Sequence, residues 1–250
     1  MCARRLSLCS GMLLVLFLAG SAPAGPVVLD KDPNLAGWWK FDETSGETTA
    51  DASRHARNAL LKGGLSFEKN SERGKMGKAI KIEDIEAYIE VPNYKGVTGT
   101  GPRTVAVWIK TTTPRGRIIS WGTDDFGKMW NFQFVRGRVG VTPKGGYFYM
   151  NEEIDDDEWH HVAAVVRKAE LPNLHDDVTL YLDGEVAEIH DIGLLDLWPL
   201  ETGNALNVRI GQGFKGSLDD LRIYDRALSD EEIMVLFKLE SDRPVPEAEK

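Results

Sequence analysis

Short runs in which apolar residues alternate with polar ones recur along most of the chain, separated by turn residues. The clearest run, residues 103–110, places Val105, Val107 and Ile109 on one face of a strand and turns Trp108 to the other. Residues 160–167 are almost continuously apolar, which indicates a central strand covered on both faces. The other runs predict strands at residues 35–41, 59–61, 79–82, 87–91, 117–121, 129–135, 138–141 and 207–211, and a hairpin with an Asp-Gly turn over 178–187.

The last organised stretch, residues 216–237, predicts a closing strand followed by a short helix. Leu218, Leu221 and Ile223 would be buried in the strand, and the Asp and Arg residues between them would be exposed. Ser229 followed three residues later by Glu232 is a capping box, which predicts where the helix begins.

About a dozen short strands and one convincing helix, with turn residues throughout, indicate an all-β fold. We expect a two-sheet antiparallel β-sandwich, or jelly roll, with one short C-terminal helix. Tyr147, Phe148 and Tyr149 are placed in a loop between strands.

The first 24 residues have the three parts of a secretory signal. Arg4 and Arg5 supply positive charge, residues 11–19 are apolar, and Ala22-Pro23-Ala24 is a small-residue cleavage site. An uncleaved N-terminal anchor is the alternative. The predicted organisation is a signal peptide at 1–24, a linker at 25–34, one domain at 35–238 and a disordered tail at 239–250. The protein would be secreted, periplasmic or at the cell surface.

The cysteine positions and the net charge limit the disulfides and the classes of partner that we expect. Both cysteines, Cys2 and Cys9, belong to the predicted signal, so the mature domain would have no disulfide. All 39 acidic residues follow residue 24, against 28 basic ones, which gives a mature net charge near −11. That charge disfavours nucleic acid, and no membrane insertion is expected after signal cleavage.

Three stretches in order resemble the laminin-G-like, concanavalin A-like lectin/glucanase superfamily, in its bacterial secreted branch. They are residues 37–46 with 51–53, residues 158–166 (beginning Glu-Trp-His-His) followed by 180–184, and residues 216–228 with 229–233. The resemblance implies a jelly roll whose first and last strands are neighbours. Members are mostly binding or adhesion modules, and some relatives are glycosidases or bind structural calcium, so membership does not decide function.

The resemblance also suggests a calcium site. Asp219 aligns with an aspartate of the calcium-binding relatives, and Asp42 begins the turn after the first strand, which should lie beside the closing strand. Calcium prefers several carboxylate and carbonyl oxygens. The alternative is that Asp219 accepts a hydrogen bond from a nearby backbone amide.

A carbohydrate site needs exposed aromatic rings for stacking and polar groups that fix hydroxyls. The ligand-binding candidates lie in and around two loops, and we expect most of the aromatic ones in the core with one or two exposed. Asn131 and Gln133 alternate with aromatic residues, which predicts a polar face on that strand. The candidates are Trp121, Asp124, Asp125, Phe126, Trp130 and Tyr147.

Two further pairs of residues are candidates for a catalytic or metal-binding role. Glu153 and Glu158 have the spacing of the catalytic strand of laminarinase-type glycosidases, but five acids in six residues indicate a solvated turn. His160 and His161 are adjacent on a strand and point to opposite faces, so packing and hydrogen bonding are expected rather than joint chelation.

The sequence therefore predicts a non-catalytic extracellular module that binds a glycan or a cell-surface protein, with no enzyme activity. A structural or adhesion domain without a sugar site and a glycosidase using Glu153 and Glu158 are the alternatives. The only cofactor expected is structural calcium.

Overall fold

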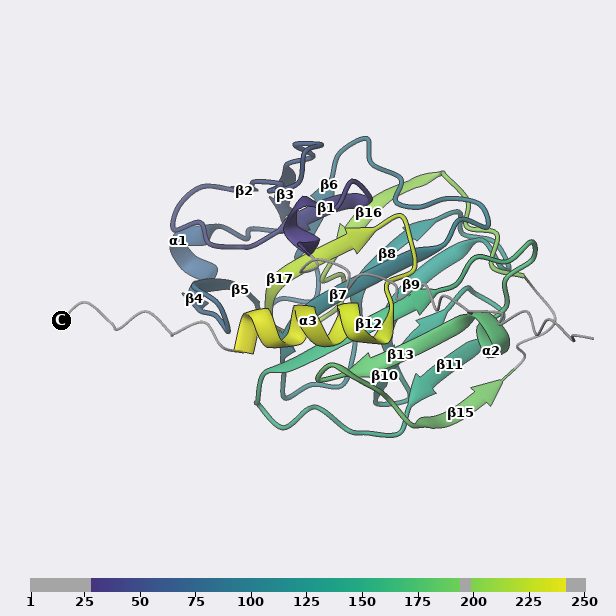
Figure 1. The fold of residues 1–250 in the computed structure, drawn as a ribbon. Helices are drawn as coiled ribbons and strands as arrows, with labels where there is room; N and C mark the ends of the chain where they lie inside the picture. The colour runs from purple at the N-terminus through teal and green to yellow at the C-terminus, as the bar shows by residue number, and fades with distance from the viewer. Residues whose placement is uncertain (1–27, 194–198, 242–250) are drawn as a thin grey trace, which may run out of the picture.

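A computed structural model describes residues 28–193 and 199–241, and within them the chain forms two antiparallel sheets packed face to face (Figure 1). The predicted two-sheet β-sandwich is therefore confirmed. Sheet A has the order β14-β13-β12-β7-β17-β5-β4, with β1 paired to β17. Its strands are β1 (Leu35–Trp39), β4 (Ser71–Arg73), β5 (Lys78–Ile82), β7 (Arg103–Lys110), β12 (His160–Val166), β13 (Val178–Leu182), β14 (Glu185–Val186) and β17 (Gly216–Tyr224).

Sheet B has the order β15-β11-β10-β9-β8-β16-β6-β3-β2. Its strands are β2 (Thr48–Thr49), β3 (Ala59–Lys62), β6 (Tyr88–Val91), β8 (Arg117–Gly122), β9 (Met129–Val135), β10 (Arg138–Thr142), β11 (Tyr147–Met150), β15 (Ile189–Gly193) and β16 (Leu206–Ile210).

Helix α3 (Asp230–Ser241) is the predicted C-terminal helix, and it lies across the outer face of sheet A (Figure 1). The capping box forms, because the Ser229 amide donates to Glu232 Oε2 at 2.9 Å and the Glu232 amide donates to Ser229 Oγ at 3.2 Å. Ile233 and Leu236 pack with the outward residues of sheet A. Three shorter elements complete the set: η1 (Leu29–Lys31), α1 (Phe67–Asn70) and α2 (Leu174–Asp177).

The main core lies between the two sheets, and α3 covers a second, smaller cluster. Strand β7 contributes to both, with Val105, Val107 and Ile109 in the main core and Ala106 in the cluster under α3. Strand β12 does the same. The near-continuous apolar sequences of these strands follow from coverage on both faces.

Strands β1 and β17 are neighbours, as the resemblance implied. The polar residues of β17 are not exposed, however, and this corrects the sequence expectation. Asp219, Asp220 and Arg222 each have at most 2% of their surface exposed. The Arg222 guanidinium donates to Asp220 Oδ2 at 2.7 Å and to Asp30 Oδ1 at 2.6 Å, and it lies over the Trp38 ring. Paired in this way, the charges are tolerated in the interior.

Residues 147–150 form strand β11 rather than the expected loop. The strand pairs with β10 and β15, and Phe148 and Met150 enter the core while Tyr147 faces outward. Aromatic residues favour such a pleated, half-buried position. Strands β2, β4 and β15 were likewise not anticipated. They are short or rich in charged residues, so their alternation is weak.

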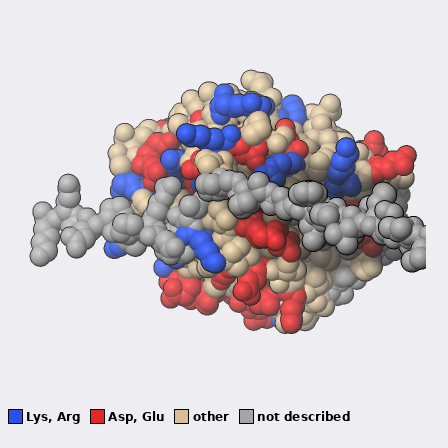
Figure 2. All heavy atoms as spheres, in the orientation of Figure 1, with Lys and Arg blue, Asp and Glu red and all other residues tan. Residues whose placement is uncertain are grey.

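The folded part begins before residue 35, because Leu29 of η1 is buried and Asp30 pairs with Arg222. Helix α3 reaches residue 241, two residues beyond the start of the predicted tail. The predicted signal peptide and residues 242–250 lie outside the described residues. Acidic and basic side chains are interspersed on the face shown in Figure 2, with a group of acidic ones along its lower edge. Among the described helices, none has the length and apolar character needed to span a bilayer.

Candidate functional site

The outer face of sheet B carries a row of polar side chains that crosses five adjacent strands. Residues opposite one another in register share a face of the sheet. The pairings align Glu90 of β6, Arg209 of β16, Ser120 of β8, Asn131 of β9 and Thr142 of β10. Because adjacent strands lie about 4.8 Å apart, this polar row is about 19 Å long. Its length suits an extended ligand better than a single small molecule.

Asn131 and Gln133 are on this face because their neighbours along β9, Trp130, Phe132 and Phe134, fill the core. The polar face predicted from their alternation is confirmed. Gln133 Nε2 donates to Thr142 Oγ1 at 3.0 Å, which joins β9 to β10 on the same side.

A hollow of about 310 Å³ opens beside β8 and β16, at the Ser120 and Arg209 positions of the polar row. Ser120 lines it together with residues of both strands and of the loops beside them. Arg117 on its wall donates to Gln212 Oε1 at 2.8 Å, which orients both side chains. The remaining lining residues are Trp121, Asp124, Met129, Leu206, Asn207 and Arg209.

Three side-chain atoms on this face are buried and have no hydrogen-bond partner among the described residues: Asn131 Oδ1, Asn207 Oδ1 and Arg209 Nε. The opposite ends of both amides are engaged, since Asn131 Nδ2 donates to the Thr142 carbonyl at 3.0 Å and Asn207 Nδ2 donates to Glu90 Oε1 at 2.7 Å. An unpaired buried polar atom costs about 1–3 kcal/mol. Two acceptors and one donor are thus left for a ligand that both donates and accepts hydrogen bonds, as a hydroxyl group does.

Trp121 and Trp130 are not available for stacking on a sugar. Both side chains are fully buried in the main core, with ring centroids 5.8 Å apart, and Trp121 Nε1 donates to the Val97 carbonyl at 3.0 Å. This corrects their place among the ligand-binding candidates. The physical reason is the volume between the sheets, which only large side chains fill.

The loop after β8 presents the other candidates from that region. Phe126 is 53% exposed. Asp124, on the wall of the hollow, pairs with Lys144 at 2.7 Å, and Asp125 pairs with Lys128 at 3.3 Å. The structure therefore brings Asp124 to the polar row and leaves Phe126 at the surface of the same loop.

Tyr147 lies at the opposite end of the outer face, on β11. Its ring stacks on Tyr149 with centroids 5.7 Å apart, and Tyr149 stacks on His190 at 5.6 Å. The Arg136 guanidinium lies 4.5 Å from the Tyr147 ring centroid. Tyr147 is half-buried.

The two metal candidates face one tight turn, residues 74–77, between β4 and β5. Asp219 Oδ2 accepts a hydrogen bond from the Met76 amide at 2.8 Å, and Asp42 Oδ1 accepts one from the Lys78 amide at 2.9 Å. A Cβ atom on Gly74 would lie 2.5 Å from Asp219 Oδ2, and one on Gly77 would collide with Asp42. Glycine at both positions lets the backbone approach the carboxylates.

One carboxylate oxygen at this turn is left unpaired within the part of the chain that the structure describes. Asp219 Oδ1 is buried without a partner among the described residues. Burial raises the pKa of Asp219 to about 8, with the negative charges of Asp220 and Asp42 acting in the same direction. No group of three or more Asp, Glu, His or Cys side chains converges in the described part of the chain. An ion at the turn would therefore need backbone carbonyl oxygens as well as the two carboxylates.

The remaining chemical candidates take structural positions. Residues 151–159 form a loop, Glu153 pairs with Arg138 at 2.9 Å and Glu158 is exposed, so the two acids do not share a strand face. The solvated-turn interpretation is confirmed. His160 bridges Asp183 and Asp156 at 3.0 and 3.3 Å, and the hydrogen bond with Asp183 raises its pKa.

The sequence did not indicate Arg209 and Ser120 of the polar row, Asn207 beside it, or the glycine turn that faces Asp42 and Asp219. The strands that carry the first three are distant along the chain, so their side chains meet only through sheet register. Gly74 and Gly77, three residues apart before an apolar strand, were the available signal for the turn.

The two packed antiparallel sheets define the class of the fold as a β-sandwich. The family model of the concanavalin A-like lectin/glucanases superfamily matches residues 83–234, which is more than half of the chain. The chain therefore belongs to this superfamily, as the sequence resemblance predicted. Among curated proteins, none matches the chain.

Solved structures share the fold at low sequence identity. Domain 4 of AbnA, a GH43 extracellular arabinanase from Geobacillus stearothermophilus in complex with arabinotriose, has a TM-score of 0.60 and 18% identity, over 81% of this chain and 98% of that one. The binding domain of botulinum neurotoxin DC in complex with rat synaptotagmin II has a TM-score of 0.54 and 12% identity, over 83% of this chain and 52% of that one. The binding domain of Paraclostridial Mosquitocidal Protein 1 has a TM-score of 0.51 and 17% identity, over 83% and 52%. The chain spans about half the length of the two toxin domains.

Proposed function

We propose that this protein is a non-catalytic module, acting outside the cytoplasm, that binds a neutral oligosaccharide along the polar row of sheet B. The observation that carries the proposal is the set of three buried, unpaired polar atoms on Asn131, Asn207 and Arg209 beside the hollow. An arabinanase domain with the same fold has been solved in complex with arabinotriose, which supports a sugar as the class of ligand.

The chemistry of the face matches a sugar chain. Amide oxygens accept from sugar hydroxyls and the Arg209 guanidinium donates to them, while Ser120 and Thr142 can do both. The apolar contribution would come from Tyr147 on β11 and from Phe126 in the loop after β8. A single bound sugar would use only part of a row about 19 Å long, so an oligosaccharide is the better match.

Calorimetric titration tests the proposal with arabinotriose and with oligosaccharides from arabinan, xylan, mannan and β-glucan. Arg209→Ala should weaken binding of the preferred sugar about tenfold or more, because hydrogen bonds to charged groups contribute about 1.5–3 kcal/mol. Gln133→Ala should weaken it less. Arg54→Ala, which removes an exposed arginine from the loop before β3, is the matched control and should bind as the wild type does.

Two results would contradict the proposal. One is that no neutral sugar binds, which favours an adhesion domain without a sugar site. The other is that Arg209→Ala and Arg54→Ala bind equally well.

We also propose that Asp42 and Asp219, with carbonyl oxygens of the 74–77 turn, hold a structural calcium ion. Bound calcium would neutralise the buried carboxylate of Asp219 and fix the turn against β17. Calcium should raise the melting temperature of the wild type relative to a chelator. The rise should be lost in Asp219→Asn and kept in Asp84→Asn, an exposed control. Equal melting temperatures with calcium and with chelator would leave Asp219 as a hydrogen-bond acceptor for Met76 only.

A further inference from the structure

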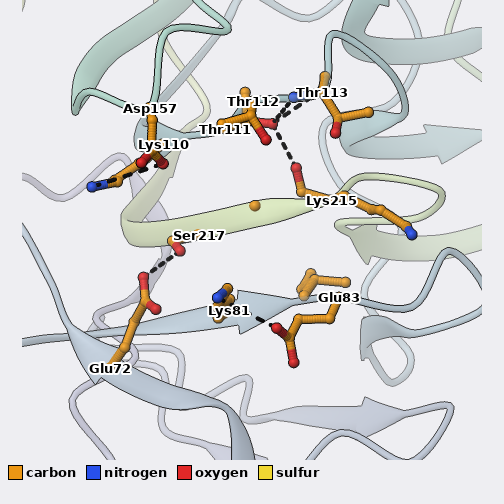
Figure 3. A pocket seen from close by; sticks show the side chains of 12 residues that line it. Glu72, Lys81, Glu83, Lys110, Thr111, Thr112, Thr113, Asp157, Lys215 and Ser217 are labelled. Atoms are coloured by element: carbon orange, nitrogen blue, oxygen red, sulfur yellow. Dashed lines mark hydrogen bonds and ion pairs between the residues drawn. The ribbon is translucent and has the colours of Figure 1, made fainter.

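A second hollow lies on the outer face of sheet A, where α3 does not cover it. It has a volume of about 470 Å³ and is formed at the ends of β5, β7 and β17 (Figure 3). Sheet register aligns Lys110 of β7, Ser217 of β17 and Lys81 of β5. The two lysines are therefore two strand spacings apart, about 10 Å, with a hydroxyl between them.

The hollow continues into a neighbouring one of about 550 Å³, and the two share Glu72 and Lys110. Trp159 lines this second part and is half-buried, and Lys75 lies there over the Trp108 ring at 4.7 Å. The two hollows together, which we name the lysine groove, form an open channel rather than a closed pocket.

The acidic residues of the lysine groove already have partners. Glu72 accepts a hydrogen bond from Ser217 Oγ, Glu83 pairs with Lys81 at 3.3 Å, and Asp157 lies 3.9 Å from the Lys110 ammonium. Figure 3 shows these three contacts around the hollow.

The basic residues that line the lysine groove outnumber the acidic ones. The groove is lined by Lys75, Lys81, Lys110, Lys215 and Arg73 against three carboxylates. Lys215 is exposed, and its ammonium has no partner among the described residues. A net positive channel on a protein of net charge −9 is a local inversion of the overall charge.

The rim opposite Lys81 is built from Thr111, Thr112 and Thr113. Thr111 Oγ1 donates to the Lys215 carbonyl at 2.6 Å and accepts from the Thr113 amide at 2.9 Å, which fixes the loop against β17. Thr112 is exposed at the rim, so its hydroxyl is open to a ligand.

From these contacts we propose that the lysine groove binds an acidic polysaccharide through the charged groups repeated along its chain. The cations are spread along the channel instead of converging on one point, which suits charges at sugar spacing more than a single small anion. Trp159 offers a ring for the sugar face, and Thr112 and Thr113 offer hydroxyls to its polar edge. This site is separate from the polar row, which lies on the other sheet.

The test compares one sugar backbone with and without its charge. Polygalacturonate and fully methyl-esterified pectin are titrated into the wild type at fixed calcium concentration. Polygalacturonate should bind, and raising the salt from 50 to 500 mM should weaken it, because exposed charges are screened. Esterified pectin should bind at least tenfold more weakly.

The double variant Lys110→Ala/Lys215→Ala should lose polygalacturonate binding by at least tenfold. Lys31→Ala/Lys168→Ala removes the same charge from two exposed positions outside the groove and should bind as the wild type does. Melting temperatures of both double variants check that they remain folded. Arg209→Ala should leave polygalacturonate binding unchanged, because Arg209 lies on the other sheet. The neutral-sugar proposal and the lysine-groove proposal can therefore fail independently.

Four results would overturn the inference, three of them obtained with the pectins and the double variants. Esterified pectin could bind as tightly as the charged polymer, both double variants could lose binding equally, or the groove variant could bind as the wild type does. A sulfated dextran arm distinguishes sulfate from carboxylate as the preferred group. Duplex DNA bound as tightly as polygalacturonate would replace the polysaccharide with a general polyanion and contradict the proposal.

Discussion

His161 is a buried imidazole beneath helix α3, so acidification should destabilise the fold through this residue. Its ring centroid lies 5.3 Å from that of Trp108 and 6.2 Å from that of Phe237, and 1% of its surface is exposed. Burial lowers the pKa of His161 to about 4. The residue is therefore uncharged in the folded protein at neutral pH.

The charged groups around the ring act in both directions. Asp220 on β17 and Asp183 in the β13–β14 turn favour the protonated ring, whereas Arg222 disfavours it. Lys75, whose ammonium lies 4.7 Å from the Trp108 ring centroid, is another positive charge in this region. Burial is the largest of these effects, and it decides the direction of the shift.

The direction in which pH changes the free energy of unfolding follows from the number of protons that each state binds. With a pKa near 6.5 in the unfolded chain, the unfolded state binds more protons than the folded state between pH 6.5 and 4. His161 therefore costs no stability above pH 6.5, and stability is lost as the pH falls toward 4. The full difference corresponds to about 3 kcal/mol, of which about 2 kcal/mol should be lost between pH 7 and pH 4.5.

Urea unfolding of the wild type and His161→Phe at pH 7, 6, 5 and 4.5 measures this effect. The raised pKa of Asp219 acts in the opposite direction, but it is common to both proteins and cancels in their difference. The variant should gain about 2 kcal/mol relative to the wild type over this range. His175→Gln, at an exposed histidine, should show no such gain. Parallel pH curves for the wild type and His161→Phe would refute the reasoning.

Three further substitutions test the buried ion pair of β17, the N-cap of α3 and the glycine turn at residues 74–77. Arg222→Ala removes the guanidinium partner of the buried Asp220 and should cost about 3–5 kcal/mol in urea unfolding, against less than about 1 kcal/mol for the exposed Arg54→Ala. Ser229→Ala removes the N-cap of α3 and should cost about 1 kcal/mol by the same assay. Gly77→Ala places a Cβ against Asp42 on a backbone with φ of +62°, and it should cost about 1 kcal/mol or more and reduce any calcium-induced rise in melting temperature.

The sandwich could be predicted from the sequence because its central strands alternate strongly. Strand β7 was placed with its true ends, and Val105 and Trp108 were assigned to opposite faces, as the structure has them: Val105 lies in the main core and Trp108 stacks on Phe237 of α3. The aromatic run of β11 could not be assigned, because adjacent tyrosine and phenylalanine residues suit a loop cluster as well as a strand. Only its pairing with β10 and β15 shows that this run is a strand.

The site was harder to predict for the same nonlocal reason. The alternation around Asn131 indicates a polar face, but it does not say that Arg209, 78 positions later, shares it. Trp121 and Trp130 have the residue type of a sugar site and fill the core, because burial depends on the opposing sheet. Asp219 shows the converse: a charged residue expected at the surface is buried where the 74–77 turn meets it.

The most direct test of the polar row is a map of backbone amide NMR shifts during titration with neutral oligosaccharides, beginning with arabinotriose. If the polar row binds the sugar, the largest changes should fall at Ser120, Asn131 and Arg209 and spread along β8, β9 and β16. Amides of sheet A, including Lys110 and Ser217, should stay unchanged. No change with any neutral sugar, or changes concentrated on sheet A, would contradict it.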